Sequence, residues 1–138
     1  MKLKVTDPMS ALEVKTEKGN KPIIPIEVLY LKADDKQTLI YFINSNCVRT
    51  NHQLKWYEEN LPEPLFCRCH NSYIVNCFYV DCTCGNRAVL KMNNIYVPVS
   101  REKMQYYKDN LALFKQQQAI HLLQNNAIHP TSIPVTLR

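Results

Sequence analysis

The stretch from Leu65 to Val80, LFCRCHNSYIVNCFYV, constrains the fold of this chain more than any other segment. It begins and ends with β-prone residues, so we expect one strand over Leu65–Cys67 and another over Cys77–Val80. The polar run Arg68–Ser72 lies between them and is followed by the triplet Tyr73–Val75, which is too apolar to be exposed. We therefore expect the triplet to anchor the polar run to a core and to hold it rigid.

Short β-prone runs also make up most of the remaining chain. Leu12 and Val14 alternate with charged residues and should face the core, whereas Ile26–Ala33 is apolar on both faces and should be covered on both sides. Pro98 suits an edge strand. The pattern predicts a mainly β, mostly antiparallel fold, neither a βαβ series nor a helix-turn-helix. The turn signals between the runs are Gly19-Asn20, Asp34–Lys36, Asn44–Asn46, Gly85-Asn86 and Asn93-Asn94.

Two short α-helices are predicted from apolar residues at helical spacing. For the first, Thr50 and Gln53 stand at capping-box spacing, and Pro62 ends the helix. Its Glu58, Glu59 and Glu63 should face away from any polyanion. For the second, Ser100 is a suitable N-cap. The expected apolar stripes are Leu54, Tyr57 and Leu61 in the first helix, and Met104, Tyr107, Leu111 and Phe114 in the second. We expect a flexible leader over residues 1–10, one domain over 11–114, and a helix extension with a mobile tail over 115–138.

Composition excludes several classes of protein. An apolar fraction of 46% in 138 residues indicates one folded domain and not a disordered chain. No signal peptide and no membrane-spanning run is apparent, so we expect a soluble cytoplasmic protein without membrane contact. Residues 1–64 hold nine Lys/Arg and nine Asp/Glu, whereas residues 65–138 hold eight and three. The basic second half favours a polyanion partner, although a solvated basic face would look the same.

Six cysteines without a secretory signal are expected to be reduced thiols. Cys67-x-Cys69 and Cys82-x-Cys84 are spaced too closely for a typical zinc site, and no cofactor is predicted. Cys69 is a candidate redox sensor, because Arg68 and His70 could lower its pKa. We predict no enzyme: Cys69-His70 is the only suggestive pair, and adjacent side chains in a strand point apart.

Two strings carry a family resemblance. Arg68–Asn76 (RCHNSYIVN) resembles the R-x-H-x-S-[aromatic]-x-V-N signature of LytTR-type DNA-binding domains, and Val97–Arg101 (VPVSR) resembles their second hallmark. The resemblance covers Leu12 to Leu113. It implies an elongated fold of small sheets stacked side by side, and a bacterial transcriptional regulator that puts loops into the major groove of double-stranded DNA. It also implies two copies on repeated sites, as a homodimer on DNA. The chain has room for no receiver domain, so we expect a stand-alone regulator or a fragment of a longer protein.

The resemblance places three loops on DNA. Gln37 would pair with adenine, Asn71 would reach the groove, and Arg101 would read guanine. Lys36 and Ser72 suit phosphate, while Arg68 and His70 would contact the backbone or brace their loop. The alternative is a LytTR-like module that controls a partner regulator by protein contact, redox-sensitive through Cys69. The full set of expected DNA-binding residues is Lys36, Gln37, Thr38, Arg68, His70, Asn71, Ser72, Ser100 and Arg101.

Overall fold

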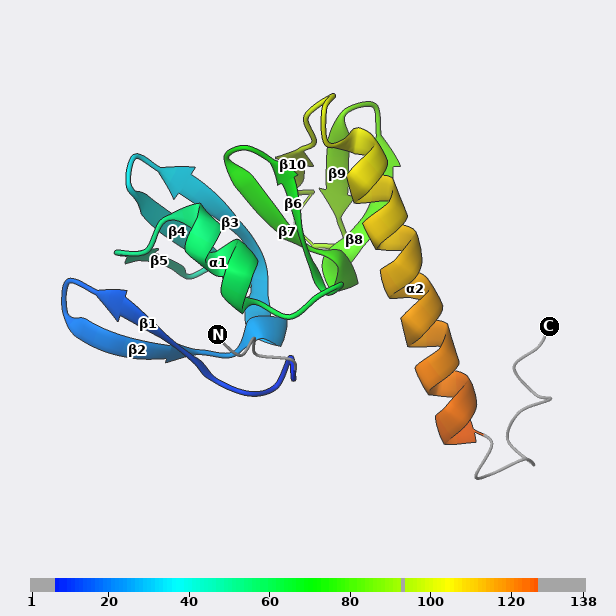
Figure 1. Ribbon diagram of the computed structural model, residues 1–138, viewed down its shortest axis with the longest axis horizontal. Coiled ribbons are helices and arrows are strands. Elements are labelled where there is room, and N and C mark those ends of the chain that lie inside the picture. Colours follow the sequence, from blue (N-terminus) through cyan, green and yellow to red (C-terminus); the bar gives the residue numbers. More distant parts are fainter. Residues whose placement is uncertain (1–6, 93, 127–138) are drawn as a thin grey trace.

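The computed structural model describes residues 7–92 and 94–126, which form three small antiparallel sheets and two α-helices. Figure 1 shows the sheets side by side, from the β1–β2 hairpin to the sheet that α2 flanks. This confirms the predicted mainly β architecture. The first sheet is β1 (Leu12–Thr16) and β2 (Gly19–Ile23). The second, in the order β5-β4-β3-β7-β6, contains β3 (Val28–Asp34), β4 (Gln37–Phe42), β5 (Cys47–Thr50), β6 (Phe66–His70) and β7 (Tyr73–Asn76). The third, in the order β10-β9-β8, contains β8 (Val80–Cys84), β9 (Arg87–Leu90) and β10 (Tyr96–Pro98).

Strand β3 lies at the centre of the five-stranded sheet and is apolar on both faces, as predicted. Leu31 packs into a core cluster with α1 (Leu54–Asn60) and the β1–β2 hairpin. Leu29 packs into a second cluster with the third sheet and α2 (Met104–Asn126). Both leucines are buried. The five-stranded sheet is therefore held from two sides, which fixes the turns at its ends.

The stretch Leu65–Val80 folds differently from the expectation at both ends. Strand β6 continues through Arg68 and Cys69 to His70, with an irregularity in its register between Arg68 and His70, so the turn to β7 is formed by Asn71 and Ser72. The predicted strand at Cys77–Val80 is wrong, because Cys77–Tyr79 is a 3-10 turn, η2.

The 3-10 turn has a clear cause in Asn76. Its side chain accepts a hydrogen bond from the Phe78 N–H at 2.9 Å and donates to the Val28 carbonyl at 2.7 Å. Asn76 is fully buried, so these two bonds satisfy an amide that would otherwise be costly to bury. They also favour a turn over a continued strand after β7.

The helices confirm the apolar stripes but not the first cap. Tyr57 and Tyr107 are fully buried. Thr50 belongs to β5, and its hydroxyl contacts the Tyr57 hydroxyl at 2.5 Å, so it does not cap α1. The N-cap of α1 is Gln53, without a side-chain bond. The predicted capping box is therefore wrong, because Thr50 is a strand residue and its hydroxyl contacts Tyr57.

Helix α2 spans 23 residues, so the extension expected after residue 114 is helical as far as Asn126. Figure 1 shows its second half projecting beyond the sheets. Before the helix, the Ser100 hydroxyl accepts a hydrogen bond from the Lys103 N–H at 3.3 Å. Parts of the expected leader (residues 1–6) and tail (residues 127–138), and Asn93 of one expected turn, lie outside the described residues. No helix within the described ranges is long and apolar enough to cross a membrane.

Candidate nucleic-acid interface

Three turns are joined along one edge of the molecule by two backbone hydrogen bonds. The Ala33 N–H, at the end of β3, donates to the Ser72 carbonyl at 2.8 Å, and the Ser100 N–H donates to the Cys69 carbonyl at 3.0 Å. Figure 1 shows the β3–β4 turn, the β6–β7 turn and the segment before α2 along its upper edge. We call these three turns, residues 34–37, 71–72 and 100–103, the loop edge. A single straight ligand could therefore meet all three.

Arg68 braces the β6–β7 turn. Its guanidinium donates to the His70 carbonyl at 3.2 Å and the Asn71 carbonyl at 2.5 Å, and a third bond of 2.9 Å reaches the Glu58 carboxylate on α1. Only 18% of the Arg68 side chain is exposed. Three partners within the protein leave this cation little capacity for a phosphate.

His70 has a bracing role as well. Its Nδ1 accepts a hydrogen bond from the Ser72 N–H at 3.0 Å, which closes the turn from the other side. The ring is half-buried and lies edge-on to Tyr73, with 5.5 Å between ring centroids. Arg68 and His70 were expected either to contact the DNA backbone or to brace their loop, and their hydrogen bonds support the bracing role.

Asn71 is exposed on the β6–β7 turn, and Arg101 is exposed on the turn before α2, next to the exposed Glu102. Within the described residues, the Asn71 side-chain amide makes no hydrogen bond and the Arg101 guanidinium makes no ion pair. Arg101 follows Ser100, whose N–H is bonded to the β6 strand. The two side chains therefore stand on neighbouring, mutually fixed turns, with their donors and acceptors open to a ligand.

The β3–β4 turn differs from the expectation at two residues. Lys36 is exposed at its tip, as expected. Thr38 is fully buried, and its hydroxyl donates to the His52 carbonyl at 2.8 Å, so the prediction that it contacts DNA is wrong. Gln37 is engaged at both ends of its amide: Nε2 donates to the Asn51 Oδ1 at 2.9 Å, and Oε1 accepts from the Arg49 Nη1 at 3.2 Å.

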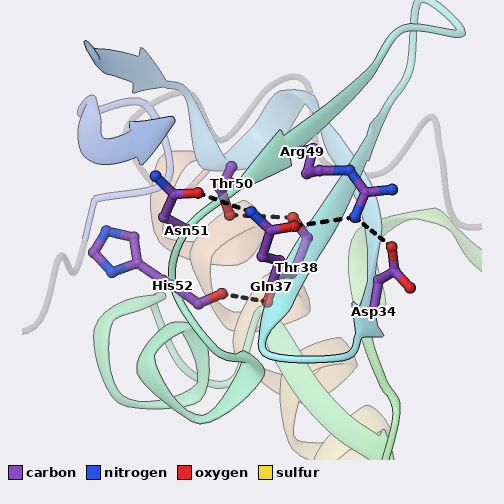
Figure 2. Close-up of polar contacts among 7 residues, drawn as sticks. All are labelled: Asp34, Gln37, Thr38, Arg49, Thr50, Asn51 and His52. Atoms are coloured by element: carbon purple, nitrogen blue, oxygen red, sulfur yellow. Dashed lines mark hydrogen bonds and ion pairs between the residues drawn. The ribbon is translucent and has the colours of Figure 1, made fainter. Parts of the chain in front are cut away.

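Figure 2 shows the polar cluster that surrounds Gln37. It consists of Asp34, Gln37, Arg49 and Asn51. We call these four residues the β5 cluster. The Arg49 guanidinium pairs with the Asp34 carboxylate, and this hydrogen bond raises the pKa of Arg49. Arg49 and Asn51 were not among the residues predicted to bind DNA. A signal was available, because a strand that follows the Asn44–Asn46 turn and pairs antiparallel with β4 brings its far end beside Gln37.

Cys69, the cysteine expected to be reactive, lies in the core. Cys69 is fully buried, and its thiol donates to the Pro98 carbonyl at 3.5 Å. Burial raises the pKa of this thiol to about 12, which outweighs the lowering effect of Arg68. The expectation of a lowered pKa at Cys69 is therefore wrong. All six cysteines are free thiols, and the described part of the chain has no group of three His, Cys, Asp or Glu side chains that could hold a metal.

Comparisons with known proteins identify the family of this fold. The family model of the LytTr DNA-binding domain matches residues 19–112. Among solved structures, the chain is similar to the LytTr DNA-binding domain of a protein described as a methyl-accepting/DNA response regulator from Bacillus cereus. The two are 30% identical, with a TM-score of 0.61, and the match covers 74% of this chain and 96% of that one. No curated protein sequence matches.

Proposed function

The chain belongs to the LytTR family of DNA-binding domains, and we propose that it regulates bacterial transcription by binding double-stranded DNA sequence-specifically, with the loop edge in the major groove. The observation that carries this proposal is the Ser100–Cys69 backbone hydrogen bond of 3.0 Å. It joins the turn of Asn71 to the turn of Arg101, so one duplex can meet both side chains.

The two side chains suit different base edges. The amide of Asn71 can donate to and accept from adenine, through its N6 and N7. The guanidinium of Arg101 can donate twice to guanine, through its O6 and N7. Because Arg68 and His70 brace the β6–β7 turn from within, Asn71 loses little conformational freedom on binding.

Phosphate contacts would come from the tips of the turns. Lys36 is exposed at the β3–β4 turn, and Ser72 and Ser100 are half-buried hydroxyls on the other two. Such contacts orient the protein on the duplex and carry no sequence information. Residues 65–138 hold eight Lys/Arg against three Asp/Glu, which favours approach to the duplex through this half of the chain.

Selection from a random duplex library tests the proposal. The wild-type chain should enrich a defined sequence. The Arg101→Ala variant should bind that sequence more weakly by about 1–3 kcal/mol, and it should bind scrambled duplexes almost as well as wild type does. Lys115→Ala, which removes an exposed cation on α2, is the charge-matched control. Equal losses of Arg101→Ala on both duplexes would remove Arg101 as a base reader, and no enrichment by wild type would reject sequence-specific binding.

Two copies on a repeated site remain part of this proposal. To measure the stoichiometry, duplexes that carry one or two copies of the enriched sequence are titrated with the protein, and the mass of each complex is determined. Deleting residues 118–138 should lower cooperativity on two repeats if the end of α2 pairs the copies. Unchanged cooperativity after the deletion would exclude that role.

A second candidate function is a protein-interaction module that controls a partner regulator. The observation that favours it is the apolar surface on the projecting part of α2, where Leu113, Ile120, Leu122 and Leu123 are 45–62% exposed. A chain with this function would show weak binding to every duplex and no enriched sequence. The library selection therefore separates the two functions.

A further inference from the structure

The β5 cluster changes which side chain of the β3–β4 turn can read a base. Pairing with adenine needs the oxygen and the nitrogen of the Gln37 amide together. Both atoms are engaged, by Arg49 at 3.2 Å and by Asn51 at 2.9 Å. Gln37 would have to break two hydrogen bonds before it met adenine, which makes it a poor reader.

We propose that Arg49, on strand β5, is the specificity-determining residue of this turn and that it recognises guanine. This inference rests on the proposed DNA binding. Arg49 uses one nitrogen, Nη1, for both of its contacts with the cluster, to the Asp34 carboxylate and to the Gln37 oxygen. The described part of the chain provides no partner for its Nε and Nη2.

The free side of Arg49 has the geometry that guanine requires. Nε and Nη2 carry two parallel N–H groups, and guanine presents two acceptors, O6 and N7, in the major groove. Adenine presents one acceptor and one donor there, so it would set a donor against a donor. The Arg49 side chain is 46% exposed, so a base edge can approach it.

Asp34 decides between a base and a phosphate as the target of Arg49. A phosphate is attracted mainly by net charge, and the Asp34 carboxylate offsets the charge of Arg49 through their ion pair. The same pair fixes the plane of the guanidinium, on which paired hydrogen bonds to a base depend. Lys36, exposed at the tip of the same turn, is left for phosphate.

The position of the cluster fits this role. Asp34 directly follows Ala33, whose N–H is bonded to the Ser72 carbonyl of the neighbouring turn at 2.8 Å. The Asn51 N–H is in turn bonded to the Lys15 carbonyl at 2.7 Å. Arg49 is thus attached to the loop edge on one side and to the β1–β2 hairpin on the other, and a duplex along the edge meets it in a fixed orientation.

The test compares three variants with wild type in the random duplex selection. Arg49→Lys keeps the charge but loses the paired donors. It should lose the preference for one guanine, about 5-fold to 150-fold over the other bases in wild type, and keep the preferences at other positions. Gln37→Ala removes the rival reader and should keep that guanine. Lys115→Ala should select the wild-type sequence. Urea unfolding of each variant reports whether its fold is retained.

Several outcomes would overturn the inference. One is an Arg49→Lys variant that selects the wild-type sequence unchanged. Another is an equal loss of affinity for every duplex, which would mark a phosphate contact. A third is a Gln37→Ala variant that loses preference at one position while Arg49→Lys does not. In each case wild type still enriches a sequence, so the proposed function stands. If wild type enriches none, the proposed function and this inference fail together.

Discussion

The Arg68 guanidinium donates a hydrogen bond to the Glu58 carboxylate at 2.9 Å, so a cation on strand β6, next to the loop edge, is paired with the acidic helix α1. Glu58 is 43% exposed and Arg68 18% exposed. The pairing explains how an acidic helix can lie close to a surface proposed to meet DNA. It also gives Arg68 a structural role, because its other two bonds hold the carbonyls of the β6–β7 turn.

Replacing Arg68 should loosen the turn without removing a base contact. Arg68→Ala should lower the free energy of unfolding by about 1–2 kcal/mol, because one half-exposed ion pair and two bonds to carbonyls are lost. DNA affinity should fall for all sequences alike. Urea unfolding and fluorescence anisotropy on enriched and scrambled duplexes measure the two effects.

Glu58→Gln is the matched variant, since its amide oxygen can still accept a hydrogen bond from Arg68. It should be nearly as stable as wild type and bind all duplexes slightly more tightly, because a negative charge beside the loop edge is gone. If Arg68→Ala altered which base is preferred at one position and left stability unchanged, Arg68 would be a direct reader and its bracing role would be wrong.

Local patterns in the sequence predicted much of the fold. The alternation of Leu12 and Val14 with charged residues predicted the buried face of β1. The two apolar faces of Ile26–Ala33 predicted a strand covered on both sides, and β3 is the central strand of its sheet. The edge position of Pro98 was also predicted. Each of these depends on side-chain periodicity along one segment, which is visible in the sequence.

Contacts between segments were not predictable in the same way. Thr50 stood at capping-box spacing, but the buried Tyr57 hydroxyl gives it a better partner within the core. Gln37 was expected to be free for adenine, but its amide atoms meet Arg49 and Asn51 from the next strand. Asn76 turned an expected strand into η2. For Thr50 and Gln37, a side chain from another element decided the outcome, and a single sequence does not show such pairings. Asn76 acts locally on the Phe78 N–H, and its other bond reaches the distant Val28 carbonyl.

The cysteines should divide into two classes by reactivity. Cys47, Cys82 and Cys84 are exposed, whereas Cys67, Cys69 and Cys77 are buried. A pKa of about 12, as for Cys69 and Cys77, leaves roughly one thiolate in 10⁴ thiols at pH 8. Iodoacetamide followed by mass spectrometry should add three labels to the native protein and six after unfolding in urea. Rapid native labelling of Cys69 would show that its site opens, and would restore a redox role for it.

Tyr57 should make the protein less stable in alkali. Burial raises its pKa from 10.0 to about 12, and the bond to Thr50 lowers it in part. The folded pKa lies above the unfolded one, so the unfolded chain ionises first as the pH rises. The contribution of the buried, neutral Tyr57 to the free energy of unfolding is therefore fully present below pH 10 and is lost as the pH rises towards 12. It should cost about 1 kcal/mol by pH 11. In urea unfolding, the free energy of unfolding of Tyr57→Phe should fall less than that of wild type between pH 8 and pH 11, although its value at pH 8 is lower. An equal loss in both proteins would contradict the assignment.

Lys36 should contribute salt-dependent affinity without sequence preference. Its side chain is exposed at the tip of the β3–β4 turn, where a phosphate contact releases about one counterion. Lys36→Ala should weaken binding to enriched and scrambled duplexes equally and reduce the slope of log K against log salt by about 0.9. Lys115→Ala should leave the slope unchanged. A loss confined to the enriched duplex would instead make Lys36 a base contact.

Asp34→Ala should separate affinity from specificity, and the two should move in opposite directions. The Asp34 carboxylate neutralises Arg49 and fixes the plane of its guanidinium. Its removal frees a positive charge beside the proposed duplex, so affinity for scrambled duplexes should rise, most strongly at low salt. The freed side chain is less ordered, so discrimination at the guanine assigned to Arg49 should fall.

Competition titrations of the enriched duplex against the same duplex with that guanine replaced give the discrimination directly. Asp81→Ala is the matched control, because Asp81 is an exposed carboxylate on β8, in the third sheet. It should change neither discrimination nor the ranking of sequences. If Asp34→Ala raised affinity and kept discrimination intact, the carboxylate would act only by repelling phosphate. Arg49 would then orient itself without its partner, because the Gln37 oxygen alone would hold the guanidinium in plane.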